Sequence, residues 1–374
     1  MTRFIIPPAS VLLAAVLLAL PGLPGARAAD TPYASAEQAR QALAVLQSNA
    51  PPEEKAVACK RLAVFGGAEA VPALARLLTD EKLASWARIP LEVIPGPAAD
   101  DALREALGRL QGNLLVGVIN SIGVRGDAKA VAPLVVYLND PGDEVASAAA
   151  VALGRIGTPP AVSALQASLR TARPSARSAV AEGLILCAER AVERSQAADA
   201  VKLYDEVRAA DVPRQRKLEA TRGSILARRA EGLPLLLEPL RSQDPAVFGI
   251  GLSTAREMPG RAVTEALAAE LDRTPAERQG ALLLALADRT DDAVGPAVTR
   301  AVREGAKPLR LAAIGVLERQ ADVASLPVLL EAAGGADAEI TRAAKSALSR
   351  LPGRDLDAAI VARLPQTTGS ARRT

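Results

Sequence analysis

Residues 127–170 read DAKAVAPLVVYLNDPGDEVASAAAVALGRIGTPPAVSALQASLR, and this stretch decides the fold. Val131, Leu134 and Leu138 are three and four residues apart, which is the spacing of one apolar helix face. The NDPG turn then ends that helix, and a second apolar run with helical spacing extends over 145–156. Two antiparallel helices joined by a short turn form one unit, and neither helix can bury its apolar face alone.

Nearly the whole chain repeats this unit. When Leu134 is taken to mark the first helix of a pair, the intervals between equivalent positions are 29, 31, 31, 38, 33, 31, 31, 31 and 31 residues. Chance amphipathicity would not hold this phase, so the sequence predicts an all-α fold, an α-solenoid of about ten antiparallel helix pairs. The equivalents of Leu134 are Leu74, Leu103, Leu165, Leu203, Leu236, Leu267, Val298, Leu329 and Ile360.

The repeat also carries a family pattern, in which small and branched residues recur at fixed places around the two helices. This pattern resembles the short bacterial HEAT-like repeat, a class often labelled after phycobilisome lyases, and the resemblance extends from about residue 35 to the last residue. It implies a superhelix whose inner, concave surface binds a partner. It implies no particular activity, because such repeats occur in scaffolds, adaptors and accessory parts of enzymes. The residues that carry it are Gly126-Asp127, Ala130-Val131, Pro133-Leu134, Asp140, Val145, Ala149, Leu153-Gly154 and Ile156-Gly157.

The first 28 residues have the pattern of a secretory signal peptide. Arg3 precedes an apolar run from Phe4 to Leu20, and Ala26-Arg27-Ala28 supplies a small-x-small cleavage site. The alternative is a membrane anchor, but the run is short for a membrane span and the cleavage site follows it directly. We therefore predict an exported protein, periplasmic or extracellular, with no stable membrane insertion after cleavage.

The charge of the remaining chain argues against a nucleic-acid partner. The full sequence has 45 Lys and Arg against 42 Asp and Glu, and removal of residues 1–28 takes away two arginines and no acids, which leaves a net charge of +1. A nucleic-acid binder would show clustered cations. The densest cation group has acids close by at Asp211 and Glu219, so it is interpreted as a solvated face. That group consists of Arg214, Arg216, Lys217 and Arg222.

The predicted solenoid covers residues 29–366 and has one irregular place, at about 190–230. The interval between equivalent positions lengthens there to 38 residues, and the segment 197–229 has longer, more charged helices with a spacing vaguely like that of a tetratricopeptide unit. This phase break predicts a bend, a docking site or, as the simpler alternative, a tolerated long loop. Regular repeats then resume. Asp244-Pro245 predicts a helix N-cap, and Thr274 with Glu277 predicts a capping box.

At the C-terminus, residues 367–374 resemble the opening of a second helix that is not completed, or a disordered tail. We interpret the chain as a truncated array or a fragment of a longer secreted protein, without a polar capping repeat. The corresponding expectation is that Ile360 and Leu364, on the last first helix, leave an apolar face open.

Chemistry-bearing residues are scarce. The chain has no histidine, which excludes histidine-dependent nucleophilic catalysis and histidine-ligated zinc or haem. Cys59 and Cys187 lie four repeats apart on helices, so no disulfide is expected between them and buried packing is the predicted role. The carboxylate pairs at 53–54, 100–101 and 291–292 precede helices, where capping explains them. We expect no catalytic residue, no cofactor and no metal.

Trp86 is the one aromatic residue with a predicted position at the edge of a core. The core face of its helix should consist of Leu83, Ala87 and Leu91, which leaves Trp86 beside it. A partly exposed tryptophan near Arg88 would suit an interface hot spot, with edge-of-core packing as the alternative.

The sequence therefore predicts a noncatalytic exported scaffold that binds a protein or peptide partner on its concave face, with Trp86 and Arg88 as possible contact residues. An alternative from another class is the accessory repeat region of a larger secreted enzyme or haem-binding protein. A third, a bilin lyase, rests only on the customary label of the repeat and conflicts with export.

Overall fold

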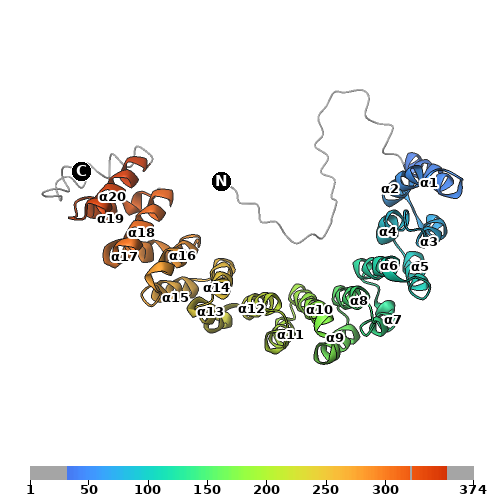
Figure 1. The fold of residues 1–374 in the computed structure, drawn as a ribbon. Coiled ribbons are helices and arrows are strands. Elements are labelled where there is room, and N and C mark those ends of the chain that lie inside the picture. Colours follow the sequence, from blue (N-terminus) through green and yellow to red (C-terminus); the bar gives the residue numbers. More distant parts are fainter. Residues whose placement is uncertain (1–31, 321, 352–374) are drawn as a thin grey trace, which may run out of the picture. The chain divides into compact units, whose positions relative to one another are not determined.

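The computed structural model describes residues 32–320 and 322–351, and all regular secondary structure in these ranges is helical (Figure 1). The chain forms an α-solenoid in which first and second helices alternate. It divides into two compact units, of which unit 1 ends at Ala106 and unit 2 begins at Leu107. The predicted signal peptide, the last helix pair with Ile360 and Leu364, and the segment 367–374 lie outside the described residues.

Unit 1 contains the first two helix pairs and nearly all of the next first helix. The first pair consists of α1 and α2, and Pro52 starts α2, as expected for proline at a first helical position. The helices are α1 (Pro32–Gln47), α2 (Pro52–Phe65), η1 (Ala68–Ala70), α3 (Val71–Leu77), α4 (Ala84–Val93) and α5 (Pro97–Leu107), whose last residue belongs to unit 2.

Unit 2 continues the alternation. Its first helices are η2 (Ala128–Ala130) with α7 (Val131–Tyr137), α9 (Pro159–Thr171), α11 (Ala197–Ala209), η3 (Arg229–Gly232) with α13 (Leu233–Arg241), α15 (Arg261–Leu271), α17 (Val294–Glu304), and η4 (Val323–Ser325) with α19 (Leu326–Ala333). Its second helices are α6 (Gly112–Arg125), α8 (Asp143–Ile156), α10 (Pro174–Glu193), α12 (Arg214–Arg228), α14 (Pro245–Glu257), α16 (Ala276–Ala287), α18 (Lys307–Gln320) and α20 (Ala338–Arg350).

Helix ends follow local chemistry. Asp244 accepts hydrogen bonds from the backbone N–H groups of Ala246 and Val247, which confirms the predicted N-cap of α14. The capping box predicted for α16 is wrong. Pro275 is the N-cap there, and the Thr274 hydroxyl donates instead to the carbonyl oxygen of Glu270 at 2.7 Å, in the preceding helix.

The core consists of the predicted repeat positions. Every described equivalent of Leu134 is buried, most of them with no exposed surface at all. The residues four positions further along are buried as well, including Val207 and Ala333. The apolar spacing of the sequence therefore identified the faces on which neighbouring helices meet.

Small residues bring three second helices of unit 2 close together. α8 packs against both α6 and α10. A Cβ atom placed on Gly154 of α8 would lie 2.5 Å from the carbonyl oxygen of Gly183 on α10, and one on Gly123 of α6 would lie 2.8 Å from the Cα atom of Ala152. These crossings leave no room for a side chain on the glycines.

The phase break has a different cause from the long loop predicted as its simpler explanation. α10 has 20 residues where α8 has 14, so the additional residues lengthen a helix. The connection to α11 is short, and Ser195 turns it with a positive φ of 61°. Arg190 and Arg194 on the added turns donate to the carbonyl oxygens of Ile156 and Gly157 at 3.1 and 3.5 Å, where positive charge stabilises the C-terminal end of α8.

Candidate functional site

An apolar stripe lies on the exposed face of the second helices of unit 1. Val57 and Val64 of α2 are 49% and 73% exposed, and Ile89 and Val93 of α4 are 41% and 58% exposed. Val57 and Val64 are seven residues apart, and Trp86, Ile89 and Val93 follow at three and four residues, so each set lies on one face of its helix. α2 packs against α4, which places the two sets beside each other. We call these five residues the unit 1 stripe.

Trp86 lies where the sequence predicts it. Leu83, Ala87 and Leu91 are buried as the core face of α4, and Trp86 beside them is half-buried. The Lys60 ammonium of α2 lies 4.7 Å from the centroid of the indole ring, a cation–π contact that holds the two helices' side chains together. Arg88 is half-buried two positions further along, and residues two apart do not share a helix face. A binding role for Trp86 and Arg88 stays a prediction.

Two surface cavities flank α2 and open at the stripe. One has a volume of about 390 Å³ and lies between α2 and α4, with Val57, Lys60, Lys82 and Trp86 in its walls. The other, about 340 Å³, lies between α1 and α2 and includes Val57 and Arg61. Val57 therefore separates two hollows, each large enough for an apolar side chain of a partner.

The exposed face of the second helices in unit 2 changes character along the chain. Val124 of α6 is 53% exposed, and Val151 of α8 is half-buried. On α10 and α12 the same face carries Glu182, Glu189 and Glu219. Burial raises the pKa of Glu189, and the neighbouring glutamates raise it further against the opposing effect of Arg222. Glutamates thus appear on second helices after α8, where Val192 of α10 and Leu284 of α16 are also 45% and 37% exposed.

The lengthened α10 leaves a groove between α9 and α11. It consists of two hollows of about 360 and 370 Å³, and the Gln166 amide, which donates to Glu206 at 2.7 Å, bridges α9 and α11 between them. Buried residues such as Cys187 and Leu203 form part of the walls, and the rim is polar. This groove is the structural counterpart of the predicted phase break.

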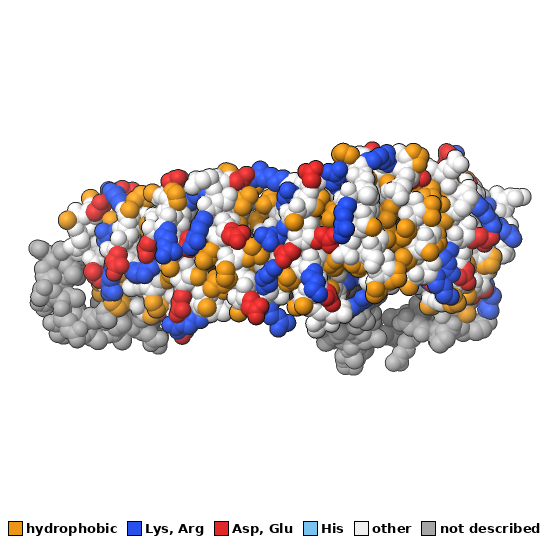
Figure 2. Space-filling model, turned by 90° about the horizontal axis from the view of Figure 1, so that it is seen from below, with side chains coloured by type: hydrophobic (Ala, Val, Ile, Leu, Met, Phe, Trp, Pro, Cys, Tyr) orange, Lys and Arg blue, Asp and Glu red, His pale blue; other side chains and the backbone are white. Residues whose placement is uncertain are grey.

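The three arginines of the cation group, which the sequence interprets as a solvated face, all form ion pairs with carboxylates. Arg214 pairs with Asp244, Arg216 with Glu182 and Glu219, and Arg222 with Glu257. Figure 2 shows blue and red side chains next to one another on the face in view, without a continuous field of either sign. Arg216–Glu219 lies within α12, and the other three ion pairs join α12 to helices of neighbouring repeats.

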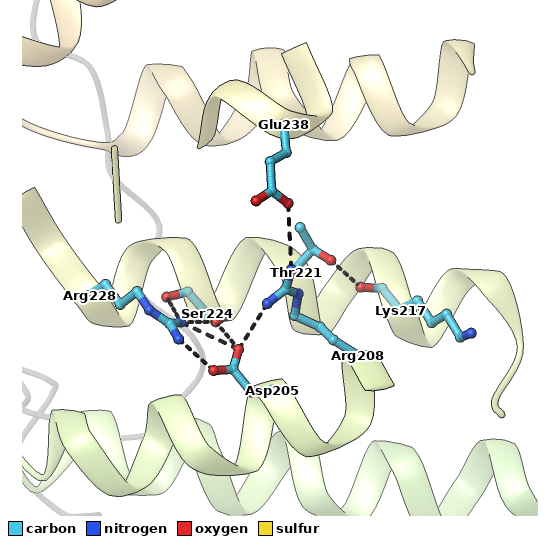
Figure 3. A network of polar contacts seen from close by, with 7 residues as sticks. All are labelled: Asp205, Arg208, Lys217, Thr221, Ser224, Arg228 and Glu238. Carbon is cyan, nitrogen blue, oxygen red and sulfur yellow. Dashed lines mark hydrogen bonds and ion pairs between the residues drawn. The ribbon is translucent and has the colours of Figure 1, made fainter. Parts of the chain in front are cut away.

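A second polar network joins α11, α12 and α13 (Figure 3). Asp205 accepts hydrogen bonds from Arg208 at 3.0 Å and Ser224 at 2.7 Å, and its other oxygen accepts from Arg228 at 2.5 Å. Burial raises the pKa of Asp205, but these three hydrogen bonds together lower it below its usual value. Arg208 also reaches Glu238 at 3.9 Å. Each of these side chains has a partner, although the buried Nε atom of Arg208 makes no hydrogen bond, and the network joins the repeats at the phase break.

The two thiols are not poised for reaction. Cys59 and Cys187 are free and buried, and burial raises the pKa of Cys59 to about 11 and that of Cys187 to about 12. Both therefore remain protonated at neutral pH, whereas the thiolate is the nucleophile and metal ligand.

Among residues 32–320 and 322–351, no three His, Cys, Asp or Glu side chains are grouped so as to hold a metal ion. Within the same ranges no helix combines the length and apolarity needed to cross a membrane.

Sequence reasoning missed most of the unit 1 stripe. α2 carries apolar residues around much of its circumference, so spacing alone did not distinguish the exposed Val57 and Val64 from the buried Ala58 and Leu62. The sequence did contain a signal for these exposed residues, because α2 has more large aliphatic residues than one buried face needs. Trp86 was identifiable because its helix has a clear core face.

Comparison with known proteins agrees with the helical repeat. The family of HEAT repeats matches residues 101–185, and a search of curated proteins gives no sequence match. Among solved structures, Kap95p in a complex with RanGDP is similar with a TM-score of 0.51 and 13% identity, over 90% of this chain and 54% of that chain.

Two further solved structures have lower scores. An engineered protein matches with a TM-score of 0.37 and 18% identity, over 84% of this chain and 98% of its own. The complex of CpcE and CpcF of phycocyanin lyase from Nostoc sp. matches with a TM-score of 0.31 and 21% identity, over 76% and 96%. These two likenesses carry no argument. The helical structure, the HEAT-repeat match over residues 101–185 and the likeness to Kap95p together show an α-solenoid fold.

Proposed function

We propose that this protein is a noncatalytic, exported scaffold that binds a protein or peptide partner along the exposed face of its second helices. The unit 1 stripe carries the proposal. It places a half-buried tryptophan and four exposed aliphatic residues on two neighbouring helices, beside hollows on both sides of α2. Single exposed apolar residues are ordinary, but a contiguous patch with an aromatic anchor is typical of protein interfaces.

The fold supports this proposal. Kap95p, which has the same kind of solenoid, is described in its complex as binding RanGDP. A solenoid presents long rows of parallel helices, and each repeat adds one helix to the row, so a partner can contact several repeats at once. In HEAT-like arrays the row of second helices is the usual concave binding face, and the unit 1 stripe lies on second helices.

Export rests on residues 1–28, and its test is direct. A signal peptide cleaved after Ala28 would leave Ala29 as the first residue of the mature protein. Intact-mass measurement and N-terminal sequencing of the protein from the periplasmic or extracellular fraction would show this start. A protein found in the cytosol with residues 1–28 attached would contradict export.

The binding proposal can be tested with a photocrosslinking amino acid placed at Val93, in the full chain expressed in its native host. Val136 on α7 is a matched control, because it is also an exposed valine, at 72%, but lies on a first helix. Crosslinks to a distinct protein at Val93 and not at Val136 are expected. Equal yields at the two positions, or no crosslinked protein at Val93, would contradict binding at this surface.

A further inference from the structure

The unit 1 stripe has a shape and a charge that point to one class of partner. We propose that it binds an acidic amphipathic helix, whose apolar face covers the stripe and whose carboxylates meet the lysines beside it. This inference rests on the proposed function, since it takes the stripe to be the interface.

The shape of the stripe favours a helix. Val57 and Val64 lie along α2, while Trp86, Ile89 and Val93 lie along α4, so the exposed side chains form two rows parallel to the helix axes. Residues seven apart on a helix are separated by about 10.5 Å along its axis. A partner helix laid between the rows presents its own apolar residues at the same interval, as in helix-in-groove recognition. The 390 Å³ hollow between α2 and α4 lies in this path.

The charge beside the stripe is positive where a partner would lie. Lys60, Arg61 and Lys82 are exposed and make no ion pair with any residue in the described part of the chain. Lys60 and Lys82 line the hollow that contains Trp86, and the ring of Trp86 holds the Lys60 ammonium at the surface.

Several acids lie near the stripe. Glu92 is in the last turn of α4, whereas Glu53, Glu54 and Asp80 lie at helix starts, where local groups offset their charge. Glu53 and Glu54 lie in the first turn of α2, facing the positive end of the helix dipole. Asp80 accepts hydrogen bonds from the backbone N–H groups of Lys82 and Leu83. The hollow between α2 and α4 is lined by Lys60 and Lys82 against one acid, Glu53, so the charge of its walls favours a carboxylate.

In unit 2, two second-helix arginines already have carboxylate partners. Arg222 of α12, which is half-buried, binds Glu257, and Arg256 of α14, which is exposed, binds Asp288. Their guanidinium groups would have to exchange one carboxylate for another on binding a partner. Lys60 and Lys82 of unit 1 need no such exchange, because neither forms an ion pair within the described residues.

Trp86 makes the test specific, because it is the only tryptophan in the chain. The mature protein is titrated with three tryptophan-free peptides of about 18 residues, roughly five helical turns. The first has a Leu/Ala face and a Glu face, the second replaces every Glu by Lys, and the third is a scrambled form of the first without an apolar face. The expected result is a saturable shift of Trp86 emission with the acidic amphipathic peptide and affinity at least tenfold weaker for the other two.

Two variants separate charge from apolar contact. Lys60→Glu with Lys82→Glu should reverse the preference between acidic and basic peptides, and Val57→Asp with Ile89→Asp should weaken both. Val136→Asp, on α7, should bind as the wild type does. Circular dichroism checks that each variant keeps its helix content, and the lysine variants alter only exposed side chains, so the charge test does not depend on the apolar variant folding.

Equal binding of the acidic and basic peptides, or an unchanged preference in the double lysine variant, would overturn the inference. If none of the peptides shifts Trp86 emission while the crosslinker at Val93 still captures a partner, the acidic-helix inference is wrong and the proposed function stands. Absence of the crosslink contradicts the proposed function itself.

Discussion

At the scale of single residues, glycines decide how closely second helices approach. Gly154 of α8 faces the backbone of Gly183 on α10, and any Cβ atom there would overlap its carbonyl oxygen. Gly280 of α16 has the same secondary structure but no neighbouring atom within 4 Å of an added Cβ. Replacement of each glycine by alanine therefore separates the effect of tight packing from the higher helix propensity of alanine.

Gly154→Ala is expected to lower the free energy of unfolding by about 2 kcal/mol, because the two helices must move apart to admit the methyl group. Gly280→Ala is expected to raise it by about 0.5–1 kcal/mol, since alanine stabilises an exposed helix relative to glycine. Urea denaturation followed by circular dichroism measures both. A stabilising Gly154→Ala would show that the α8–α10 crossing yields easily.

Glu270 of α15 is a buried acid that binds two arginines, Arg241 of α13 and Arg273 in the connection after α15. Its side chain is 4% exposed and accepts from Arg241 at 2.9 and 2.5 Å and from Arg273 at 3.2 Å. The hydrogen bond from Arg241 is the main cause of the lowered pKa of Glu270. A carboxylate with a lowered pKa stabilises the fold above its unfolded pKa of about 4.5, and this contribution is lost as pH falls through the folded value.

Glu270→Gln is therefore expected to cost about 2 kcal/mol of unfolding free energy at pH 7, the range for hydrogen bonds to charged groups. The difference from the wild type should shrink as pH falls below about 4.5, because the wild-type carboxyl then takes up a proton. Denaturant unfolding of both proteins at a series of pH values measures this. A difference that is the same at pH 7 and pH 3 would mean that the charge of Glu270 contributes nothing.

At the scale of helices, caps and lengths set the boundaries of each repeat. Asp244 combines two roles at the start of α14, since it caps the helix and pairs with Arg214, an exposed arginine of α12. Exposed ion pairs contribute little, because both charges are well solvated when apart. The cap is the larger contribution, because it satisfies backbone N–H groups that have no helical partner.

Asp244→Ala is expected to destabilise the protein by about 1 kcal/mol. Asp244→Asn keeps an acceptor for the same N–H groups but removes the charge, so it should retain most of that stability. Thermal and urea unfolding of the two variants decides between the roles. An asparagine variant as unstable as the alanine variant would assign the main contribution to the Arg214 pair.

At the scale of the whole molecule, the main contacts among the described helices lie within a repeat or between neighbouring repeats, and the chain forms two compact units. The stability of such an array is approximately a sum of repeat and interface contributions, so distant repeats need not unfold together. In unit 2, arginine bridges such as Arg216–Glu182 and Arg303–Glu331 join successive repeats. Unit 1 carries the only tryptophan, which makes its unfolding separately observable.

Urea unfolding is expected to give different midpoints for Trp86 fluorescence, which reports on unit 1, and for circular dichroism, which reports on all helices. A Trp86→Phe, Phe248→Trp variant moves the reporter to α14 in unit 2, where Phe248 is buried. Its fluorescence midpoint should differ from that of Trp86. Coincident transitions for all three signals would instead indicate one cooperative unit.

The sequence alone determined the parts of this protein that depend on short-range order. Helix spacing, prolines and capping residues act within one or two turns, so the repeat period, the buried positions such as Leu134 and Leu165, and the edge position of Trp86 could be predicted from it. The buried face could not be predicted where a helix carries apolar residues on several faces, as at Val57 and Val64 of α2.

Only the tertiary structure decided how neighbouring repeats meet. The contact of Lys60 with Trp86, the crossing of Gly154 and Gly183, and the groove beside the lengthened α10 all join residues more than 25 positions apart or depend on such contacts. The apolar spacing of a helix states which face is buried. It does not state the distance or rotation of the next helix, because these follow from the side chains of both partners together.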